Sequence, residues 1–168
     1  LYIIRSMNPD GEARDPGFDG RVNNNNVDLN RNFPTDNWLP DWDRDGCWIF
    51  RPTTGGTYGG SEPETRSVMS FISAHKITAL ISYHSAGLGI FPGGKLTDPA
   101  SSRLAVALAS VSPYKYPPKE TGCSFTGQLA DYAVRLGIVA VDIELTNHTD
   151  TDFAINKKVL EAFLNWQP

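Results

Sequence analysis

Between Asn8 and Gly60 the chain runs for roughly fifty residues without the apolar repeat of a helix or a strand. Gly, Pro, Asn and Asp dominate this stretch. A connection of that length normally carries a function or is disordered. Disordered segments contain few aromatic residues, whereas this one contains Trp38, Trp42, Trp48 and Phe50. We therefore expect a packed loop with a functional role, around which the regular elements must be arranged.

The most unusual part of this loop is the string from Val27 to Phe33, which follows four consecutive asparagines. Asparagine favours turns and competes for backbone hydrogen bonds, so the string predicts neither helix nor strand. Arg31, between two asparagines, offers a planar cation that can grip a carboxylate or phosphate with two hydrogen bonds. Arg21 is a second guanidinium on the same loop. The alternative is an Arg31 that satisfies local carbonyls and an Arg21 that is a solvent-exposed charge.

Length and composition fit an ordinary globular protein. The chain has 168 residues, 40% apolar and 20% charged, with a net charge of −4, and we expect one domain over residues 1–168. The acidic balance argues against a nucleic-acid surface, and no apolar run reaches membrane-spanning length. The start at Leu1, without Met or a signal peptide, suggests a processed or truncated chain. Cys47 and Cys123 can form one disulfide or remain free thiols.

The rest of the chain alternates between strand and helix patterns. Buried strands are expected over 1–6, 77–83 and 138–143, and a glycine-rich loop over 87–94. Helices are expected from a Ser61 cap to about His75, from a Ser101 or Ser102 cap to about Val111, from near Gly127 to Gly137, and from 149–152 onward with Phe153, Val159, Leu160, Phe163 and Trp166 facing inward. This order predicts an α/β fold, with a mostly parallel or mixed sheet flanked by helices.

Two residues that can do chemistry follow buried strands. His84 comes after the strand expected at 77–83, and Glu144 after the strand at 138–143. Ligands of such sheets bind beyond the carboxyl ends of the strands, so Glu144 is a candidate general base and His84 a candidate metal ligand. Alternatively, His84 is a hydrogen-bonded structural histidine, and Glu144 is a carboxylate paired with an arginine. Asp142 shares the face of Glu144 and is a candidate structural carboxylate.

Taken together these residues resemble the zinc carboxypeptidases of the carboxypeptidase A/T type, in the order and with the spacing of that family. The matching strings are Asn8-Pro9-Asp10-Gly11, Arg21, Val27 to Phe33, Ser61-Glu62-Pro63-Glu64, Ser82-Tyr83-His84-Ser85 and Ile143-Glu144-Leu145. The resemblance spans nearly the whole chain but covers only the C-terminal part of a family catalytic domain. It implies a carboxypeptidase-like, N-terminally incomplete fold.

The resemblance also implies a role for each matching residue. His84 would be the third zinc ligand, and Glu144 the base that activates the metal-bound water. Arg21 would polarise the scissile carbonyl, while Asn30 and Arg31 would bind the terminal carboxylate of a peptide substrate. Tyr116 is the nearest match to the tyrosine that covers bound substrate, although its spacing is shifted and Tyr114 matches equally well. The pocket for the substrate side chain would be formed by residues 122–131, with Phe125, Gln128, Leu129 and Asp131 as candidates.

Three departures from the family pattern matter. The first two zinc ligands of the family lie on a His-x-x-Glu motif, and no histidine here is followed three residues later by Glu, since Thr78, Gly87 and Thr151 stand at those positions. A catalytic zinc needs about three protein ligands, so this chain alone is expected to bind zinc weakly and to be inactive. No firm match exists for the mobile tyrosine. Ala86 stands where animal digestive enzymes often have Tyr, which favours a bacterial peptidase, with cell-wall peptides as one substrate class.

Three functions follow from these residues. The first is the C-terminal portion of a secreted or periplasmic zinc carboxypeptidase, whose remaining ligands lie on a missing N-terminal segment. The second is a metal-free binding module that recognises peptide C-termini through Asn30 and Arg31. The third is an unrelated hydrolase that uses Ser85 beside His84, although Ser85 lies in no Gly-x-Ser-x-Gly turn. His148 is a loop residue or a substitute ligand, and His75 an ordinary residue at a helix end.

Overall fold

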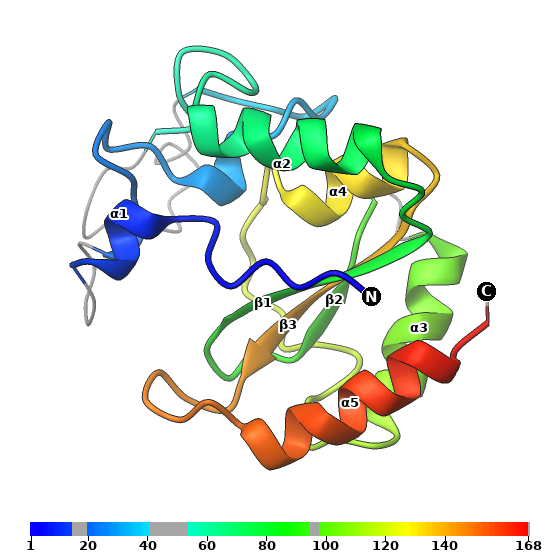
Figure 1. The fold of residues 1–168 in the computed structure, drawn as a ribbon. Helices are drawn as coiled ribbons and strands as arrows, with labels where there is room; N and C mark the ends of the chain where they lie inside the picture. The colour runs from blue at the N-terminus through cyan, green and yellow to red at the C-terminus, as the bar shows by residue number, and fades with distance from the viewer. Residues whose placement is uncertain (15–19, 41–53, 95–97, 168) are drawn as a thin grey trace. The chain divides into compact units, whose positions relative to one another are not determined.

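The computed structural model describes residues 1–14, 20–40, 54–94 and 98–167 (Figure 1). They form two compact units, one made of Leu1–Lys76 with Cys123–Leu129 and the other of Ile77–Gly122 with Ala130–Pro168. The prediction of one domain over 1–168 stays a prediction. Trp42, Trp48, Phe50 and Cys47, on which some of the sequence predictions rested, lie outside the described residues. Cys123 is disulfide-bonded.

The second unit is built on a mixed three-stranded sheet, in agreement with the predicted fold class. Its strands are β1 (Ala79–Ser85), β2 (Ile90–Pro92) and β3 (Val139–Leu145), in the order β1-β3-β2. β1 runs parallel to β3, and β2 runs antiparallel to it. β2 was not predicted, because three residues between glycines are too few to show an alternating pattern.

The apolar core of this unit lies between the sheet and two helices, α3 (Pro99–Ala109) and α5 (Phe153–Asn165), which Figure 1 shows on the same side of the sheet. Its buried members come from β2, β3, the two helices and the segment after α3: Ile90, Leu104, Ala105, Leu108, Tyr114, Val139, Val141, Ile143 and Val159. The prediction of an inward Phe153 was wrong. It is 79% exposed, because the helix begins there, one residue after Asp152 with its left-handed φ of 49°.

Two of the three strand predictions need correction. Residues 1–6 form no strand, and Leu1, Tyr2, Ile3 and Ile4 are exposed. A strand exists only through hydrogen bonds to a neighbour, and no described strand pairs with this segment. β1 forms, but only half-buried, because it lies at the edge of the described sheet. β3, the central strand, is buried as predicted over its first five residues.

The helix starts differ from their predicted caps. α2 (Pro63–Ala74) follows Glu62 rather than Ser61, and α3 is capped by Asp98, whose carboxylate accepts a hydrogen bond from the Ser101 N–H at 2.7 Å. The Ser61 hydroxyl is used otherwise, since it donates to the carboxylate of Glu62 at 2.7 Å. The described residues also form two short α-helices, α1 (Pro9–Glu12), where a turn was expected, and α4 (Leu129–Arg135). Among the described residues, no helix is long and apolar enough to cross a membrane.

Ser101 connects α3 to the central strand instead of capping the helix. Its side chain is fully buried, and its hydroxyl accepts a hydrogen bond from the backbone N–H of Ala140 at 3.0 Å. A buried N–H without a partner loses its hydration without compensation. The hydroxyl therefore satisfies the backbone of β3 just before the strand reaches Asp142 and Glu144.

We expect Ser101→Ala to lower the free energy of unfolding by about 1–3 kcal/mol, because it leaves the Ala140 N–H buried without an acceptor. Urea unfolding at neutral pH measures the effect. Ser102→Ala is the matched control, since the Ser102 hydroxyl donates to the Asp98 carbonyl of its own helix start. Equal losses in the two variants would contradict this role for Ser101.

Candidate functional site

An ion pair forms the centre of the arginine-bearing loop in the first unit. Arg21 donates from Nε and Nη2 to Oδ2 of Asp28, at 2.8 and 2.7 Å. Asp28 is buried, and its other carboxylate oxygen accepts from the Asn30 N–H at 3.1 Å, which caps the short 3-10 helix η2 (Leu29–Arg31). Burial alone would raise the pKa of Asp28, but the guanidinium groups of Arg21 and Arg31 outweigh it and hold this pKa below its ordinary value. Arg21 is therefore an oriented cation.

Arg31 is buried, with only 3% of the residue exposed. Its guanidinium lies over the ring of Phe125, 5.0 Å from the ring centroid, and donates to the backbone carbonyl of Asn30. A cation over an aromatic face is held electrostatically, and more strongly where water is excluded. The alternative expectation, that Arg31 bonds a local carbonyl, is therefore met by its hydrogen bond to Asn30, while the contact with Phe125 goes beyond it.

Hydrogen bonds to backbone groups of residues 123–129 hold this segment against the loop that carries Arg31. Asn30 Oδ1 accepts from the Leu129 N–H at 2.8 Å, the Phe33 N–H donates to the Gly127 carbonyl at 3.0 Å, and the Gly127 N–H donates to Thr35 Oγ1 at 3.1 Å. Gly127 has a φ of 62°, and a Cβ there would lie 2.3 Å from the Arg31 carbonyl oxygen. Only glycine permits this approach, and it places Phe125 beside Arg31.

Asparagine side chains hold the rest of the loop. Asn23 and Asn25 donate to the buried Glu62 carboxylate at 2.8 and 2.7 Å. Asn32 donates to the Gly55 carbonyl at 2.6 Å and accepts from the Glu62 N–H at 3.1 Å. Burial acts to raise the pKa of Glu62, but hydrogen bonds from Ser61, Asn23 and Asn25 outweigh it and lower that pKa. The loop is packed, as predicted, over its described residues.

In the second unit, four polar side chains share one face of the sheet. The β1–β3 register pairs Ser82 with Asp142 and His84 with Glu144, and residues two apart on a strand project to the same face. His84 Nε2 lies 2.9 Å from Ser82 Oγ and 3.5 Å from Asp142 Oδ1. Asp142 is buried, whereas His84 and Glu144 are partly exposed. His84 and Glu144 lie near the carboxyl ends of the parallel strands β1 and β3. They form the last pair but one of the β1–β3 ladder, so they lie within the paired strands and not in the loops beyond them.

Neighbouring residues have structural contacts. His148 lies in an exposed loop, with Nδ1 3.0 Å from Ser85 Oγ, while Ser85 follows His84 and so projects to the opposite face of β1. This geometry argues against a hydrolase built on Ser85 beside His84. The hydroxyl oxygen of the buried Tyr114 lies 3.0 Å from both Asp152 Oδ2 and Asn156 Oδ1, so its single proton is directed between two acceptors. Tyr116 is partly buried against the core.

The structure thus gathers the predicted residues into two groups. Arg21, Asn30 and Arg31 lie together in the first unit, and His84 and Glu144 in the second. Two contacting residues, Asp28 beside Arg21 and Ser82 beside His84, were not predicted, although both stand within the strings that carried the family resemblance. For Ser82 the spacing supplied a signal, since it precedes His84 by two positions and so shares its face of the strand.

The described residues do not provide a complete zinc site. His84 is a suitable ligand, and the Asp142 carboxylate faces its ring. No group of three His, Cys, Asp or Glu side chains in the described ranges could hold a metal ion, and a tetrahedral zinc needs at least that many. The donor set therefore fits a partial site only, and no reaction step can be assigned to a metal on these residues alone.

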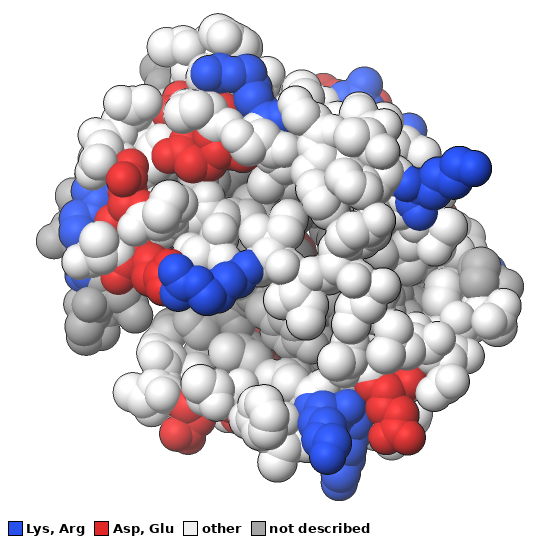
Figure 2. All heavy atoms as spheres, in the orientation of Figure 1, with Lys and Arg blue, Asp and Glu red and all other residues white. Residues whose placement is uncertain are grey.

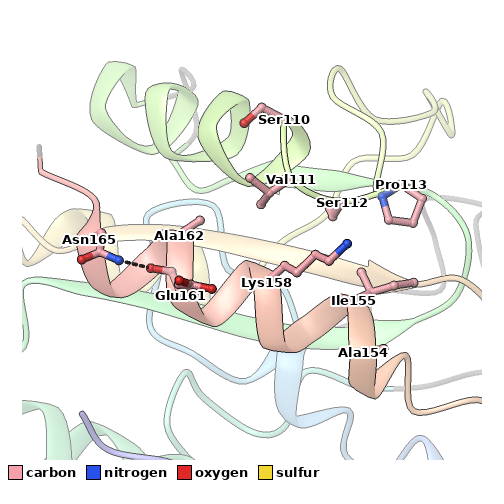
Figure 3. A pocket seen from close by; sticks show the side chains of 10 residues that line it. All are labelled: Ser110, Val111, Ser112, Pro113, Ala154, Ile155, Lys158, Glu161, Ala162 and Asn165. Atoms are coloured by element: carbon pink, nitrogen blue, oxygen red, sulfur yellow. Dashed lines mark hydrogen bonds between the residues drawn. The ribbon is translucent and has the colours of Figure 1, made fainter.

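Surface features lie elsewhere. A hollow of about 750 Å³ runs between α5 and the turn after α3 (Figure 3), lined by Ser110, Val111, Ser112, Pro113, Ala154, Ile155, Lys158, Glu161, Ala162 and Asn165. It contains none of the candidate residues. On the face drawn in Figure 2, acidic and basic side chains lie next to one another, and most of that face carries neither charge.

Comparison with known proteins identifies the class to which this fold and these residues belong. The family model described as zinc carboxypeptidase matches residues 1–165. The chain belongs to this zinc carboxypeptidase family, which supports a peptidase function.

The relatives divide into two kinds. Carboxypeptidase D of Mus musculus is 36% identical over 93 residues, which are 52% of this chain and 6% of that protein. Murein peptide amidase A of Vibrio campbellii is 30% identical over 169 residues, 91% of this chain and 63% of that protein. The chain therefore spans less than two thirds of each of these relatives.

Solved structures support the carboxypeptidase fold. Murein-tripeptide amidase MpaA from Escherichia coli O157 superposes with a TM-score of 0.62 at 24% identity, over 96% of this chain and 66% of that one. Carboxypeptidase A from Helicoverpa armigera superposes with a TM-score of 0.65 at 20% identity, over 94% of this chain and 48% of that one. At these identities the likeness shows the fold alone.

We expect Asp28→Asn to lower the free energy of unfolding by about 3 kcal/mol at pH 7, because it leaves the Arg21 charge without its buried partner. The folded-state pKa of Asp28 is depressed, so its contribution is complete above the unfolded-state value of about 4 and is lost as the pH falls through the lower folded-state pKa. Urea unfolding of the wild type and the variant at pH 7, 5 and 3 measures the difference.

The difference in the free energy of unfolding between the wild type and Asp28→Asn should stay constant from pH 7 to 5 and become smaller at pH 3. Asp10→Asn serves as a control, because Asp10 accepts one exposed backbone hydrogen bond from Asn24. A gap that widens on acidification would contradict the depressed pKa.

Proposed function

We propose that the protein containing this chain is a zinc-dependent carboxypeptidase, which hydrolyses the C-terminal peptide bond of peptides. The observation that carries the proposal is the β1–β3 register, which pairs His84 with Glu144 on one polar face of the sheet. An imidazole that can bind a metal beside a carboxylate that can accept a proton is the pair that metal-assisted hydrolysis requires. Membership of the zinc carboxypeptidase family supports the same function.

In this proposal Glu144 takes a proton from the attacking water and later gives it to the leaving amine. Arg21 is held by Asp28 as an oriented cation, which suits the polarisation of a carbonyl and the stabilisation of the oxyanion. His84 serves as one zinc ligand, and the further ligands come from outside these residues. When bound, the metal supplies Lewis acidity and a lowered water pKa.

Asn30 and Arg31 are proposed to bind the terminal carboxylate of the substrate. A guanidinium presents two parallel donors to a carboxylate, and a neighbouring amide fixes the orientation. Phe125 lies against Arg31, so it is the best supported of the four candidates for contact with the substrate side chain. Tyr116 remains the proposed covering tyrosine, because the hydroxyl of Tyr114 already bonds Asp152 and Asn156.

We also propose that the protein acts in a secreted or periplasmic setting. The disulfide at Cys123 supports an oxidising compartment. Murein peptide amidase A is among the relatives, which makes cell-wall peptides one proposed substrate class beside protein C-termini.

A second candidate function is a metal-free module that recognises peptide C-termini through Asn30 and Arg31. It is favoured by the lack of a His-x-x-Glu motif in these 168 residues. The module would bind peptides with a free carboxylate and hydrolyse none, with or without added zinc. The gene sequence upstream of Leu1 separates the two candidates, since the peptidase requires His-x-x-Glu there.

In the complete peptidase, Glu144→Gln should lower kcat by at least about 100-fold while leaving the zinc content unchanged, because the amide cannot accept the proton. Peptide hydrolysis and elemental analysis of the same preparation measure the two effects. Glu161→Gln, on the exposed face of α5, makes the same chemical change away from the sheet and should hydrolyse peptides normally. Full activity in Glu144→Gln would refute its assignment as the base.

Arg31→Ala in the same protein should raise KM by about 10–100-fold for peptides with a free C-terminal carboxylate, since a charge-assisted hydrogen bond contributes about 1.5–3 kcal/mol. Amidated peptides, which lack the carboxylate, should be affected far less. Because Arg31 is buried, the variant Arg31→Lys, which keeps the positive charge, is measured beside Arg31→Ala. Arg103→Ala, on the surface of α3, is the second control. Equal losses on acid and amide substrates would argue against carboxylate binding.

A further inference from the structure

Asp142 is an unexpected residue in β3. Its neighbours along the central strand are apolar, Val139 to Val141 before it and Ile143 after it, and its own side chain is only 6% exposed. A buried carboxylate is unfavourable unless compensating groups surround it. The role proposed for Glu144 gives no reason for a second acidic side chain two residues earlier on the same face.

The contacts of His84 supply that reason. Its Nε2 atom faces both Asp142 Oδ1, at 3.5 Å, and Ser82 Oγ, at 2.9 Å. The register explains the geometry, since Ser82 pairs with Asp142 one step before His84 pairs with Glu144. The edge of the ring that carries Nε2 is thus directed back along the two strands, toward a hydroxyl and a carboxylate.

These two partners differ in what they can donate. An ionised carboxylate only accepts hydrogen bonds, whereas a hydroxyl donates or accepts, and a neutral imidazole carries its proton on one nitrogen only. A proton on Nε2 can be donated to the Ser82 hydroxyl oxygen at 2.9 Å, and it lies on the side of the Asp142 carboxylate, 3.5 Å away, whose charge favours it. A proton on Nδ1 would instead turn the lone pair of Nε2 toward the negative charge of Asp142. The two groups on the Nε2 side of the ring therefore favour the tautomer that is protonated on Nε2.

We propose that Asp142, assisted by Ser82, is a positioning residue that keeps the proton of His84 on Nε2, so that Nδ1 is the nitrogen that offers its lone pair to a metal. Histidine ligands generally donate their other ring N–H to a carboxylate or carbonyl, which fixes the tautomer and raises the basicity of the ligand nitrogen. The metal-binding part of this inference rests on the proposed function, whereas the tautomer does not.

The test is nuclear magnetic resonance of this chain labelled with ¹⁵N-histidine, without metal, at a pH where the three histidines are neutral. Long-range ¹H–¹⁵N correlations distinguish a protonated ring nitrogen from a bare one. His75→Gln and His148→Gln variants assign the His84 signals by elimination. We expect the wild type to show His84 protonated on Nε2.

Asp142→Asn should increase the Nδ1-protonated fraction of His84 at least threefold, because the amide can turn its NH₂ group toward Nε2. Such a replacement of a carboxylate beside a catalytic histidine gives the wrong tautomer in the Ser-His-Asp hydrolases. Ser82→Ala should retain the wild-type tautomer, since the carboxylate remains. Asp150→Asn, in the exposed loop after β3, is the matched control and should change nothing.

Two results would overturn the inference: a wild type protonated on Nδ1, or an Asp142→Asn protein with a native amide spectrum and an unchanged tautomer. A tautomer lost in Ser82→Ala and kept in Asp142→Asn would transfer the role to the hydroxyl and so refute that of Asp142. This measurement uses neither metal nor substrate. Failure of the proposed peptidase function would therefore not refute the tautomer of His84, and a different tautomer would not refute the peptidase function.

Discussion

The parallel pairing of β1 with β3 determines both the core and the chemistry of the second unit. Alternation sends Val141 and Ile143 into the core and leaves Asp142 and Glu144 on the opposite face. A slip of one residue would exchange the two faces, which would bury the polar side chains among α3 and α5. The apolar core therefore enforces the register that places His84 opposite Glu144, and the site depends on packing on the other side of the sheet.

The first unit is organised by different forces. Its loop lacks apolar periodicity and is held by hydrogen bonds from asparagines and by the ion pair between Arg21 and Asp28. A buried ion pair adds little net stability over an apolar pair, but the loss of one partner is strongly unfavourable. Such an arrangement fixes a conformation more than it adds stability. This suits a loop whose proposed task is to present Arg21 and Arg31 in defined orientations.

The helices and strands could be predicted from the sequence where the apolar pattern of a single segment was sufficient. The apolar periods around Val68 and Val159 and the apolar run of β3 gave α2, α5 and the central strand. The strand expected at 1–6 and the missed β2 show the limit, because a strand is defined by its neighbour and not by its own residues. Helix caps were misplaced for a related reason: Ser101 has a capping side chain, but a backbone group of another element uses it.

For the candidate site, spacing and residue type predicted which side chains could do chemistry but not what orients them. The contact of Asp142 with His84 depends on the register of two strands separated by more than fifty residues. Likewise, the position of Phe125 beside Arg31 depends on the close backbone approach at Gly127. Contacts of this kind are set by tertiary structure and leave no local pattern in the chain.

The central claim is that the polar face of β1 and β3 is one side of a metal-dependent hydrolytic site. Crystals of the complete protein, measured at the zinc absorption edge, test it most directly. The account predicts an anomalous peak about 2.0–2.1 Å from Nδ1 of His84, on the face that carries Glu144. A zinc peak bound to other residues, with His84 outside its coordination sphere, would contradict it.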